Sequence, residues 1–232
     1  MKNILIMAAG KSSRFGKAKC LTKIGKTTVL ENLIKLAKSS RNRVIVVVSN
    51  NVFEQDLEMI KTICDKTHTI IINSKYTNGT ANNLKDYAKY VASDAFIMWS
   101  DIIVADESNF VKFLKTDFNH VLTIPVVFEK EPYAAVLVDD SGVPFDMLYS
   151  KKTGERPVEG YHDQCIFYIP ELVWQLCFNS IKEIDGEKNI LDIISIAHNK
   201  GLFTEIIKYP NKLVNSFNTV EELKNLKKLK KT

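Results

Sequence analysis

The stretch Ala8-Ala9-Gly10-Lys11-Ser12-Ser13-Arg14-Phe15-Gly16 directly follows an apolar run, Ile4 to Met7. An apolar run that ends in a polar, glycine-containing loop is typical of a buried strand followed by a ligand-binding turn at the carboxyl edge of a parallel sheet. Gly10 lets the backbone come close to a ligand, and Ser12 and Ser13 keep the loop compact with donors available. The loop therefore predicts phosphate binding, with an ordinary tight turn as the alternative.

Two cationic residues in or near this loop are candidates for binding phosphate, and the glycine pattern of the loop excludes two common nucleotide-binding motifs. Arg14 and Lys19 can both reach phosphate oxygens. The loop is not a Walker loop, because no G-K-[ST] follows after four intervening residues, and it is not G-x-G-x-x-G, because Ser12 stands at the second glycine position. No acidic residue is clearly placed for a ribose after the second predicted strand. A dehydrogenase is therefore excluded.

Strand-like and helical patterns alternate through the first half of the chain. Thr28 and Glu31 have the spacing of a capping box at the start of the first helix. This alternation predicts a mainly parallel sheet with right-handed crossovers. The predicted strands of the whole chain are 4–7, 44–48, 70–72, 95–99, 133–138, 143–148 and 165–169; the predicted helices begin near 28 and span about 53–64, 81–91, 172–176 and 190–198, the last ending at Gly201.

The composition sets limits on the class of protein. The chain has 232 residues, 45% hydrophobic and 25% charged, which is typical of a globular protein, and its net charge of +5 is too mild to indicate a nucleic-acid partner. Its first apolar segment is too short to span a membrane and lacks a signal-peptide cleavage region, so we expect a cytoplasmic location and no membrane partner. The four scattered cysteines, which we expect to be reduced packing residues, are Cys20, Cys64, Cys165 and Cys177.

The loop resembles the A-A-G-x-G/S-x-R-x signature of the nucleotidyltransferases with a glycosyltransferase-A-like fold. Further segments resemble this family in the same order. Their counterparts are the base-contacting G-T-A turn, the strand end that holds the metal, a β segment of the sugar-1-phosphate members, and a helix of the N-acetylglucosamine-1-phosphate uridylyltransferases. In this chain they are Gly79-Thr80-Ala81, Trp99-Ser100-Asp101, Ala134 to Lys151 and Gly186 to Gly201.

The resemblance implies a fold and an activity. The expected fold is a Rossmann-like three-layer α/β/α architecture with a mixed, mainly parallel sheet. One domain, residues 1–232, would contain a nucleotide-binding half (1–128) and an acceptor-binding half with a C-terminal helix (129–232). The implied activity is transfer of a nucleotidyl group from an NTP to a phosphorylated small acceptor, with release of pyrophosphate, by a monomer or homodimer. A catalytically silent nucleotide sensor on the same fold is the alternative.

The resemblance also implies a set of site residues. Asp101 ends a predicted buried strand at the ligand edge and suits Mg²⁺, with Asn215 as second ligand. Asn218 stays open as the alternative, although with Glu221 it also has the spacing of a helix cap. Arg14 and Lys19 are the expected catalytic cations. The remaining candidates are Ala8, Ala9, Gly10, Ser12, Ser13, Gly79 and Thr80 for the nucleotide, and Lys151 and Asp163 for the acceptor.

Several departures from the family pattern concern the acceptor and the base. Where N-acetylglucosamine enzymes have N-T-G-I, this chain has Asp163-Gln164-Cys165-Ile166, and Ser150 replaces the glutamate of an E-K pair. The usual proline before the loop lysine is Ala18, and the glycine before the metal aspartate is Ser100. N-acetylglucosamine 1-phosphate is therefore not the expected acceptor.

The chain also resembles cytidylyltransferases that act on choline phosphate or molybdopterin, so a non-sugar acceptor is the alternative to a sugar 1-phosphate. Ser74 stands where uridylyltransferases place a glutamine. The expected nucleotide is a pyrimidine triphosphate, and we favour CTP slightly over UTP.

Overall fold

The computed structural model describes residues 1–10, 15–76, 78–87, 93–149, 154–155, 157–184, 186–217 and 219–229. Its helices are α1 (Val29–Ser39), α2 (Glu54–Lys66), α3 (Thr80–Asn83), α4 (Glu107–Lys115), α6 (Glu171–Cys177), α7 (Ile193–Asn199) and α8 (Val220–Leu229). Short 3-10 turns are η1 (Lys19–Leu21), η2 (Lys85–Tyr87), η3 (Phe178–Ser180) and η4 (Ile190–Asp192).

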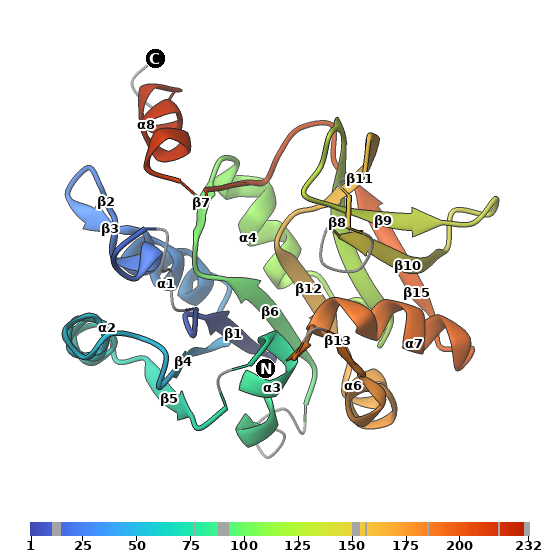
Figure 1. Ribbon diagram of the computed structural model, residues 1–232, viewed down its shortest axis with the longest axis horizontal. Helices are drawn as coiled ribbons and strands as arrows, with labels where there is room; N and C mark the ends of the chain where they lie inside the picture. Colours follow the sequence, from blue (N-terminus) through green and yellow to red (C-terminus); the bar gives the residue numbers. More distant parts are fainter. Residues whose placement is uncertain are drawn as a thin grey trace.

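A ten-stranded sheet runs through the molecule (Figure 1). Its order is β10-β9-β11-β8-β12-β6-β1-β4-β5, and β15 also pairs with β8. The strands are β1 (Asn3–Met7), β4 (Arg43–Ser49), β5 (Ile70–Ser74), β6 (Ala95–Trp99), β8 (Leu122–Lys130), β9 (Ala134–Val138), β10 (Pro144–Tyr149), β11 (Glu159–Asp163), β12 (Ile166–Ile169) and β15 (Thr204–Lys208). Three small pairs are separate: β2 (Lys23–Ile24) with β3 (Thr27–Thr28), β7 (Ile102–Val104) with β16 (Val214–Ser216), and β13 (Glu183–Ile184) with β14 (Glu187–Lys188).

The direction of the strands divides the sheet into two parts. The strands β6, β1, β4 and β5 are parallel to one another, so their carboxyl ends meet at one edge. Antiparallel pairing begins at β12 and continues to β10, whereas β15 is parallel to β8. Seven of the ten strands, namely β1, β4, β5, β6, β8, β9 and β15, therefore point the same way, and the prediction of a mixed, mainly parallel sheet is confirmed.

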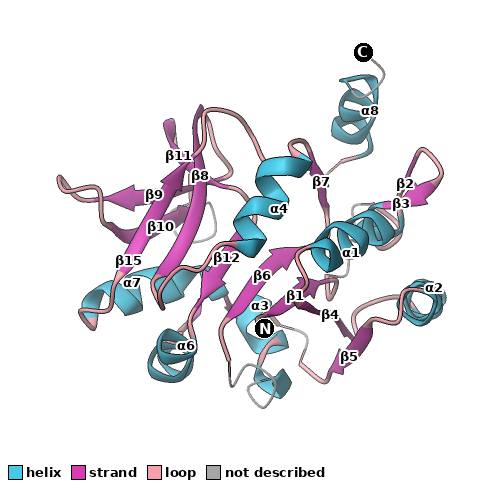
Figure 2. Cartoon of the chain, turned by 180° about the vertical axis from the view of Figure 1, so that it is seen from behind, coloured by secondary structure: helices cyan, strands magenta, loops and turns pink. Residues whose placement is uncertain are grey.

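Two hydrophobic layers cover the sheet (Figures 1 and 2). All five residues of β1 are buried, and successive side chains point to opposite faces. Ile4 and Ile6 pack with the helices α1, α2 and α4, whereas Leu5 and Met7 pack with α3, α6 and α7. The chain therefore has the expected three-layer α/β/α arrangement.

Local signals in the sequence explain where several helices begin and end. The Thr28 hydroxyl oxygen accepts a hydrogen bond from the Glu31 N–H, and the Glu31 carboxylate accepts one from the Thr28 N–H, so the capping box of α1 is confirmed. The helix α7 ends at Asn199 with Lys200 as its C-cap, and Gly201 follows with a φ of +68°, which confirms the predicted terminating glycine.

The third predicted helix is shorter than expected. The sequence pattern extended from Ala81 to Val91, but α3 ends at Asn83 and continues only as the 3-10 turn η2. Asparagine is a weak helix former, and Asn82 and Asn83 are adjacent here. Residues 88–92 lie outside the described part of the chain.

Among the described residues, no helix has the length and apolar character needed to cross a membrane.

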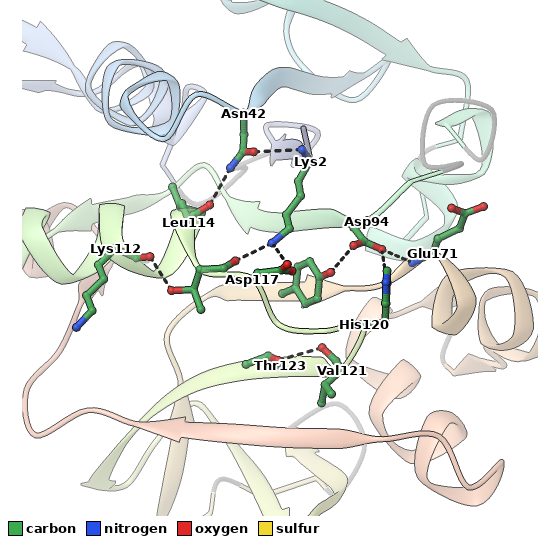
Figure 3. A network of polar contacts seen from close by, with 12 residues as sticks. Lys2, Asn42, Asp94, Lys112, Leu114, Asp117, His120, Val121, Thr123 and Glu171 are labelled. Carbon is green, nitrogen blue, oxygen red and sulfur yellow. Dashed lines mark hydrogen bonds and ion pairs between the residues drawn. The ribbon is translucent and has the colours of Figure 1, made fainter.

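A polar network fixes the edge of the sheet opposite the carboxyl ends of the parallel strands (Figure 3). The Lys2 ammonium donates a hydrogen bond to the Thr116 carbonyl at 2.7 Å and lies 5.0 Å from the centre of the Tyr168 ring. The Tyr168 hydroxyl donates to Asp94 Oδ2 at 2.5 Å, and the Glu171 N–H donates to Oδ1 at 3.1 Å. These contacts join the N-terminal strand to elements from three later parts of the chain.

Burial alone would raise the pKa of Asp94, but the hydrogen bonds from Tyr168 and Glu171, with His120 nearby, outweigh it and lower this pKa below its ordinary value. The charged form is therefore the one that the folded chain stabilises. This stabilisation is present at neutral pH and is lost as the pH falls through the lowered pKa of Asp94.

We predict that Tyr168→Phe lowers the free energy of unfolding by about 1.5–3 kcal/mol at pH 7, because it removes a hydrogen bond to a charged group. The loss should become smaller near pH 3, where protonation of Asp94 weakens the same bond. Urea unfolding at both pH values measures it. Tyr76→Phe is the control, since that ring is 43% exposed. A loss independent of pH, or an equal loss in the control, contradicts the prediction.

Candidate active site

A cavity of about 580 Å³ opens at the carboxyl ends of the parallel strands. It is formed by the segments that follow β1, β4, β5 and β6, together with the β13–β14 hairpin. This is the edge at which open α/β sheets bind ligands. The lining residues are Met7, Ala8, Ala9, Gly10, Ala18, Lys19, Cys20, Asn51, Asn78, Gly79, Thr80, Asn83, Trp99, Ser100, Asp101, Glu187 and Asn189.

An ion pair between Lys19 and Asp101 forms part of the cavity wall. The Lys19 Nζ lies 2.8 Å from Asp101 Oδ2, and the two side chains are 15% and 25% exposed. Two backbone contacts hold the partners in place: the Ala18 N–H donates to the buried Asp56 carboxylate at 2.6 Å, and the Ser100 N–H donates to the Met7 carbonyl at 3.2 Å. The sequence predicted both side chains but not their direct contact.

Cys20 lies beside this ion pair and is buried. Burial, and then the charge of Asp101, raise the pKa of the Cys20 thiol to about 12. The protonated thiol is therefore the favoured form at neutral pH. The expectation that Cys20 is a packing residue agrees with its burial.

The predicted phosphate loop begins at the cavity wall. The Ala8 N–H donates to the Val47 carbonyl at 2.7 Å, and the Ala9 carbonyl accepts from the Ser49 hydroxyl at 2.8 Å. A Cβ placed on Gly10 would have no atom of the described residues within 4 Å. Ser12, Ser13 and Arg14 lie outside the described residues.

The Gly79–Thr80 turn packs against the segment 188–190. The Thr80 hydroxyl donates to Asn189 Oδ1 at 3.1 Å and accepts from the Ile190 N–H at 2.9 Å. Gly79 has a φ of +95°, and a Cβ added there would lie 2.3 Å from the Lys188 carbonyl oxygen. Only glycine fits this position, because the two backbones touch.

The structure describes one of the two residues that were predicted to bind the acceptor. Lys151 lies outside the described residues. Asp163 is at the end of β11, only 6% exposed, and does not line the cavity. Its Oδ2 accepts from the Cys165 N–H at 2.9 Å, which closes the turn between β11 and β12. Burial raises the pKa of Asp163.

Asn215, the predicted second metal ligand, is half-buried on β16 beside the strand that follows Asp101. The register places Ser216 opposite Ile102, the first residue after Asp101. Asn215 does not line the described cavity. The alternative, Asn218, lies outside the described residues. In the described part of the chain, no three His, Cys, Asp or Glu side chains gather as a metal site, so a cation at Asp101 would take further ligands from phosphates, water or an amide.

The sequence pattern predicts no site role for the five asparagine and glutamate residues that line the cavity. Glu187 and Asn189 belong to a segment that resembles the uridylyltransferases, but its pattern does not predict that these two residues line the cavity. Asn51, Asn78 and Asn83 had no signal, because single asparagines after strands are common in ordinary turns.

A glycine-containing loop after the first strand, a lysine–aspartate pair and a glycine turn lie together on one cavity of an α/β sheet. The chain belongs to the MobA-like NTP transferase domain family, which it matches over residues 4–174.

Among known proteins, the bifunctional protein GlmU of Buchnera aphidicola subsp. Schizaphis graminum (strain Sg) is 26% identical over 134 residues. This match covers 56% of the chain and 28% of GlmU, so the chain corresponds to less than a third of that protein.

Solved structures share the fold over nearly the whole chain. The CTP:phosphocholine cytidylyltransferase LicC of Streptococcus pneumoniae has a TM-score of 0.72 at 13% identity, covering 98% of both chains. A putative glucose-1-phosphate thymidylyltransferase of Bacillus anthracis has 0.75 at 16%, covering 99% of this chain and 94% of its own. The inositol-1-phosphate CTP transferase of T. maritima has 0.76 at 17%, with the same coverage.

We predict that Gly79→Ala destabilises the fold by at least ~3 kcal/mol, because the new methyl group overlaps the backbone of Lys188. Gly142→Ala is the matched control: its φ of +84° carries the same kind of backbone strain, but its Cβ would meet open space. The control should lose only about 1–2 kcal/mol. Urea unfolding measures both, and equal losses contradict the importance of the Gly79–Lys188 contact.

Proposed function

We propose that the protein transfers the nucleotidyl group of CTP or UTP to a phosphorylated small molecule in a Mg²⁺-dependent reaction that releases pyrophosphate. The observation that carries this proposal is the Lys19–Asp101 pair on the wall of a cavity bounded by the loop after β1 and the Gly79–Thr80 turn. A site for a nucleoside triphosphate needs a cation, a carboxylate that binds the metal, and backbone N–H groups that can approach the phosphates. These three features support the proposal here.

The reaction requires charge stabilisation more than a protein nucleophile. A phosphate oxygen of the acceptor forms a bond to the α-phosphorus, and the bond from that phosphorus to the bridging oxygen breaks. Its electron pair leaves with pyrophosphate. Negative charge therefore increases on the α-phosphate and the leaving group, and positioned cations stabilise it.

Asp101 suits a magnesium ion, because it offers a partly exposed carboxylate at the ligand edge of the sheet. Mg²⁺ bound there would neutralise charge on the reacting phosphates. We propose Asn215 as its second protein ligand, with Asn218 as the alternative. Lys19, released from Asp101 when phosphates bind, would hold the triphosphate together with Arg14.

The remaining residues divide between the two substrates. We propose that Ala8, Ala9 and Gly10 approach the nucleotide through their backbone, with Ser12 and Ser13 as donors and Gly79 and Thr80 beside the base. Lys151 would bind the phosphate of the acceptor. Asp163 would act on the acceptor side through the turn that it closes with the Cys165 N–H.

The acceptor is a sugar 1-phosphate or a non-sugar phosphate such as choline phosphate. The chain resembles both kinds of enzyme in fold, and its departures at Ser150 and 163–166 argue against N-acetylglucosamine 1-phosphate. We propose that residues 1–232 act as one domain, cytoplasmic and monomeric or homodimeric, without a nucleic-acid or membrane partner.

A pyrophosphate-release screen tests this function. The four nucleoside triphosphates are combined with phosphorylated sugars, polyols, amines and amino acids, with Mg²⁺ and with EDTA. We expect release that depends on acceptor and Mg²⁺, fastest with CTP and next with UTP. Acceptor-dependent release with ATP or GTP but not with either pyrimidine nucleotide contradicts the proposed base, and no release with any pair contradicts the proposed activity.

Asp101→Asn should lower kcat at least about a hundredfold, because the change removes a charge that acts mainly in the transition state. Thermal unfolding should change little, since the side chain is a partly exposed member of the cavity wall. The matched control is Asp140→Asn, which neutralises an exposed carboxylate in the turn between β9 and β10. If Asp101→Asn turns over at nearly the normal rate, Asp101 has no place in the mechanism.

A further inference from the structure

Asn83 is a buried polar residue with an unused hydrogen-bonding atom at the cavity. Its side chain is 6% exposed and lines the cavity, and its Oδ1 has no hydrogen-bond partner among the described residues. A buried amide oxygen without a partner costs about 1–3 kcal/mol, so such atoms are rare in folded proteins. Where one occurs on the wall of a ligand site, a donor on the ligand accounts for it.

Asn83 and the ion pair come from different segments of the cavity wall. Asp101 follows β6, whereas Asn83 belongs to α3, which follows β5 and packs against β4 and β14. A nucleotide whose phosphates lie near Lys19 and Asp101 therefore extends its base toward α3.

The position of Asn83 is fixed before any ligand binds. Its N–H donates to the Gly79 carbonyl at 3.2 Å, and the adjacent Thr80 is held by Asn189 and Ile190. The Asn83 Oδ1 atom is itself buried in the free protein, so it reaches a ligand in the cavity after the side chain turns. The anchored backbone limits the ordering that binding requires.

The residue that replaces the uridylyltransferase glutamine cannot read the base. Ser74 is fully buried, its hydroxyl oxygen accepts from the Tyr76 N–H at 3.2 Å, and it does not line the cavity. Base selection in this chain therefore needs another side chain. Asn83 lines the cavity directly after the Gly79–Thr80 turn.

We propose that the Asn83 side-chain oxygen accepts a hydrogen bond from the exocyclic amino group of cytosine, which makes Asn83 a specificity-determining residue for CTP. The inference rests on the proposed nucleotidyltransferase function. Uracil carries a carbonyl oxygen where cytosine carries the amino group, so UTP would place two acceptors against each other. Sites that hydrogen-bond a substrate group discriminate strongly against an analogue that lacks it.

The test is calorimetric binding of three triphosphates with Mg²⁺: CTP, UTP, and the 2-pyrimidinone riboside triphosphate, which is CTP without the amino group. Wild-type protein should bind CTP about tenfold or more tighter than the other two. Asn83→Ala should weaken CTP binding to the level of the analogue, while binding of UTP and of the analogue changes less than about twofold.

Asn82→Ala is the matched control. Asn82 is the neighbouring asparagine, its Oδ1 also has no partner in the described part of the chain, and its side chain does not line the cavity. This variant should keep the full preference for CTP. Thermal unfolding without nucleotide provides a second readout: Asn83→Ala should keep or raise its Tm, because the oxygen that it removes has no partner among the described residues.

Three results overturn the inference: an equal loss of affinity for all three triphosphates, an unchanged preference for CTP in Asn83→Ala, or a wild-type preference for UTP. These results are distinct from failure of the proposed function, which would appear as no binding of any pyrimidine triphosphate and no pyrophosphate release. Pyrimidine binding with a base preference unaffected by Asn83→Ala overturns the role of Asn83 alone.

Discussion

The close approach of Gly79 to the Lys188 backbone determines how the two halves of the chain enclose the cavity. This approach brings the turn after β5 against β14, and the hydrogen bonds of Thr80 with Asn189 and Ile190 hold the turn there. Any side chain at position 79 would push β14 away and move Glu187 and Asn189 with it. This backbone contact, together with the Thr80 hydrogen bonds, therefore holds Glu187 and Asn189 in the cavity wall.

The Lys19–Asp101 pair orders the cavity wall of the free protein. The Lys19 Nζ and the Asp101 carboxylate lie 2.8 Å apart, and both side chains are largely buried, so each holds the other in place. In the proposed reaction, Lys19 would take a phosphate as its partner and Asp101 would take the metal cation, so one ion pair would be exchanged for two. The reorganisation of protein charges in that reaction would be correspondingly small.

The sequence predicts features that depend on neighbours along the chain. The capping box of Thr28 and Glu31 and the buried strands are confirmed, because capping and alternation act over a few residues. The third helix is shorter than predicted. The prediction rested on the spacing of apolar residues and did not take into account the low helix propensity of two consecutive asparagines. Glu187 and Asn189 face the cavity only through the β13–β14 hairpin and its contact with Gly79, and no local pattern encodes a contact between residues about a hundred positions apart.

The turn between β11 and β12 supports the cavity wall although a residue other than glycine occupies its left-handed position. Cys165 has a φ of +54°, a conformation that favours glycine, and it stands where the related N-T-G-I motif has one. The strain of about 1–2 kcal/mol is offset locally, because Asp163 accepts from the Cys165 N–H and the Cys165 carbonyl accepts from the Trp99 N–H. Trp99 lines the cavity, so this turn supports the end of β6. Because Asp101 lies two residues beyond Trp99, the same turn supports the segment that carries its carboxylate.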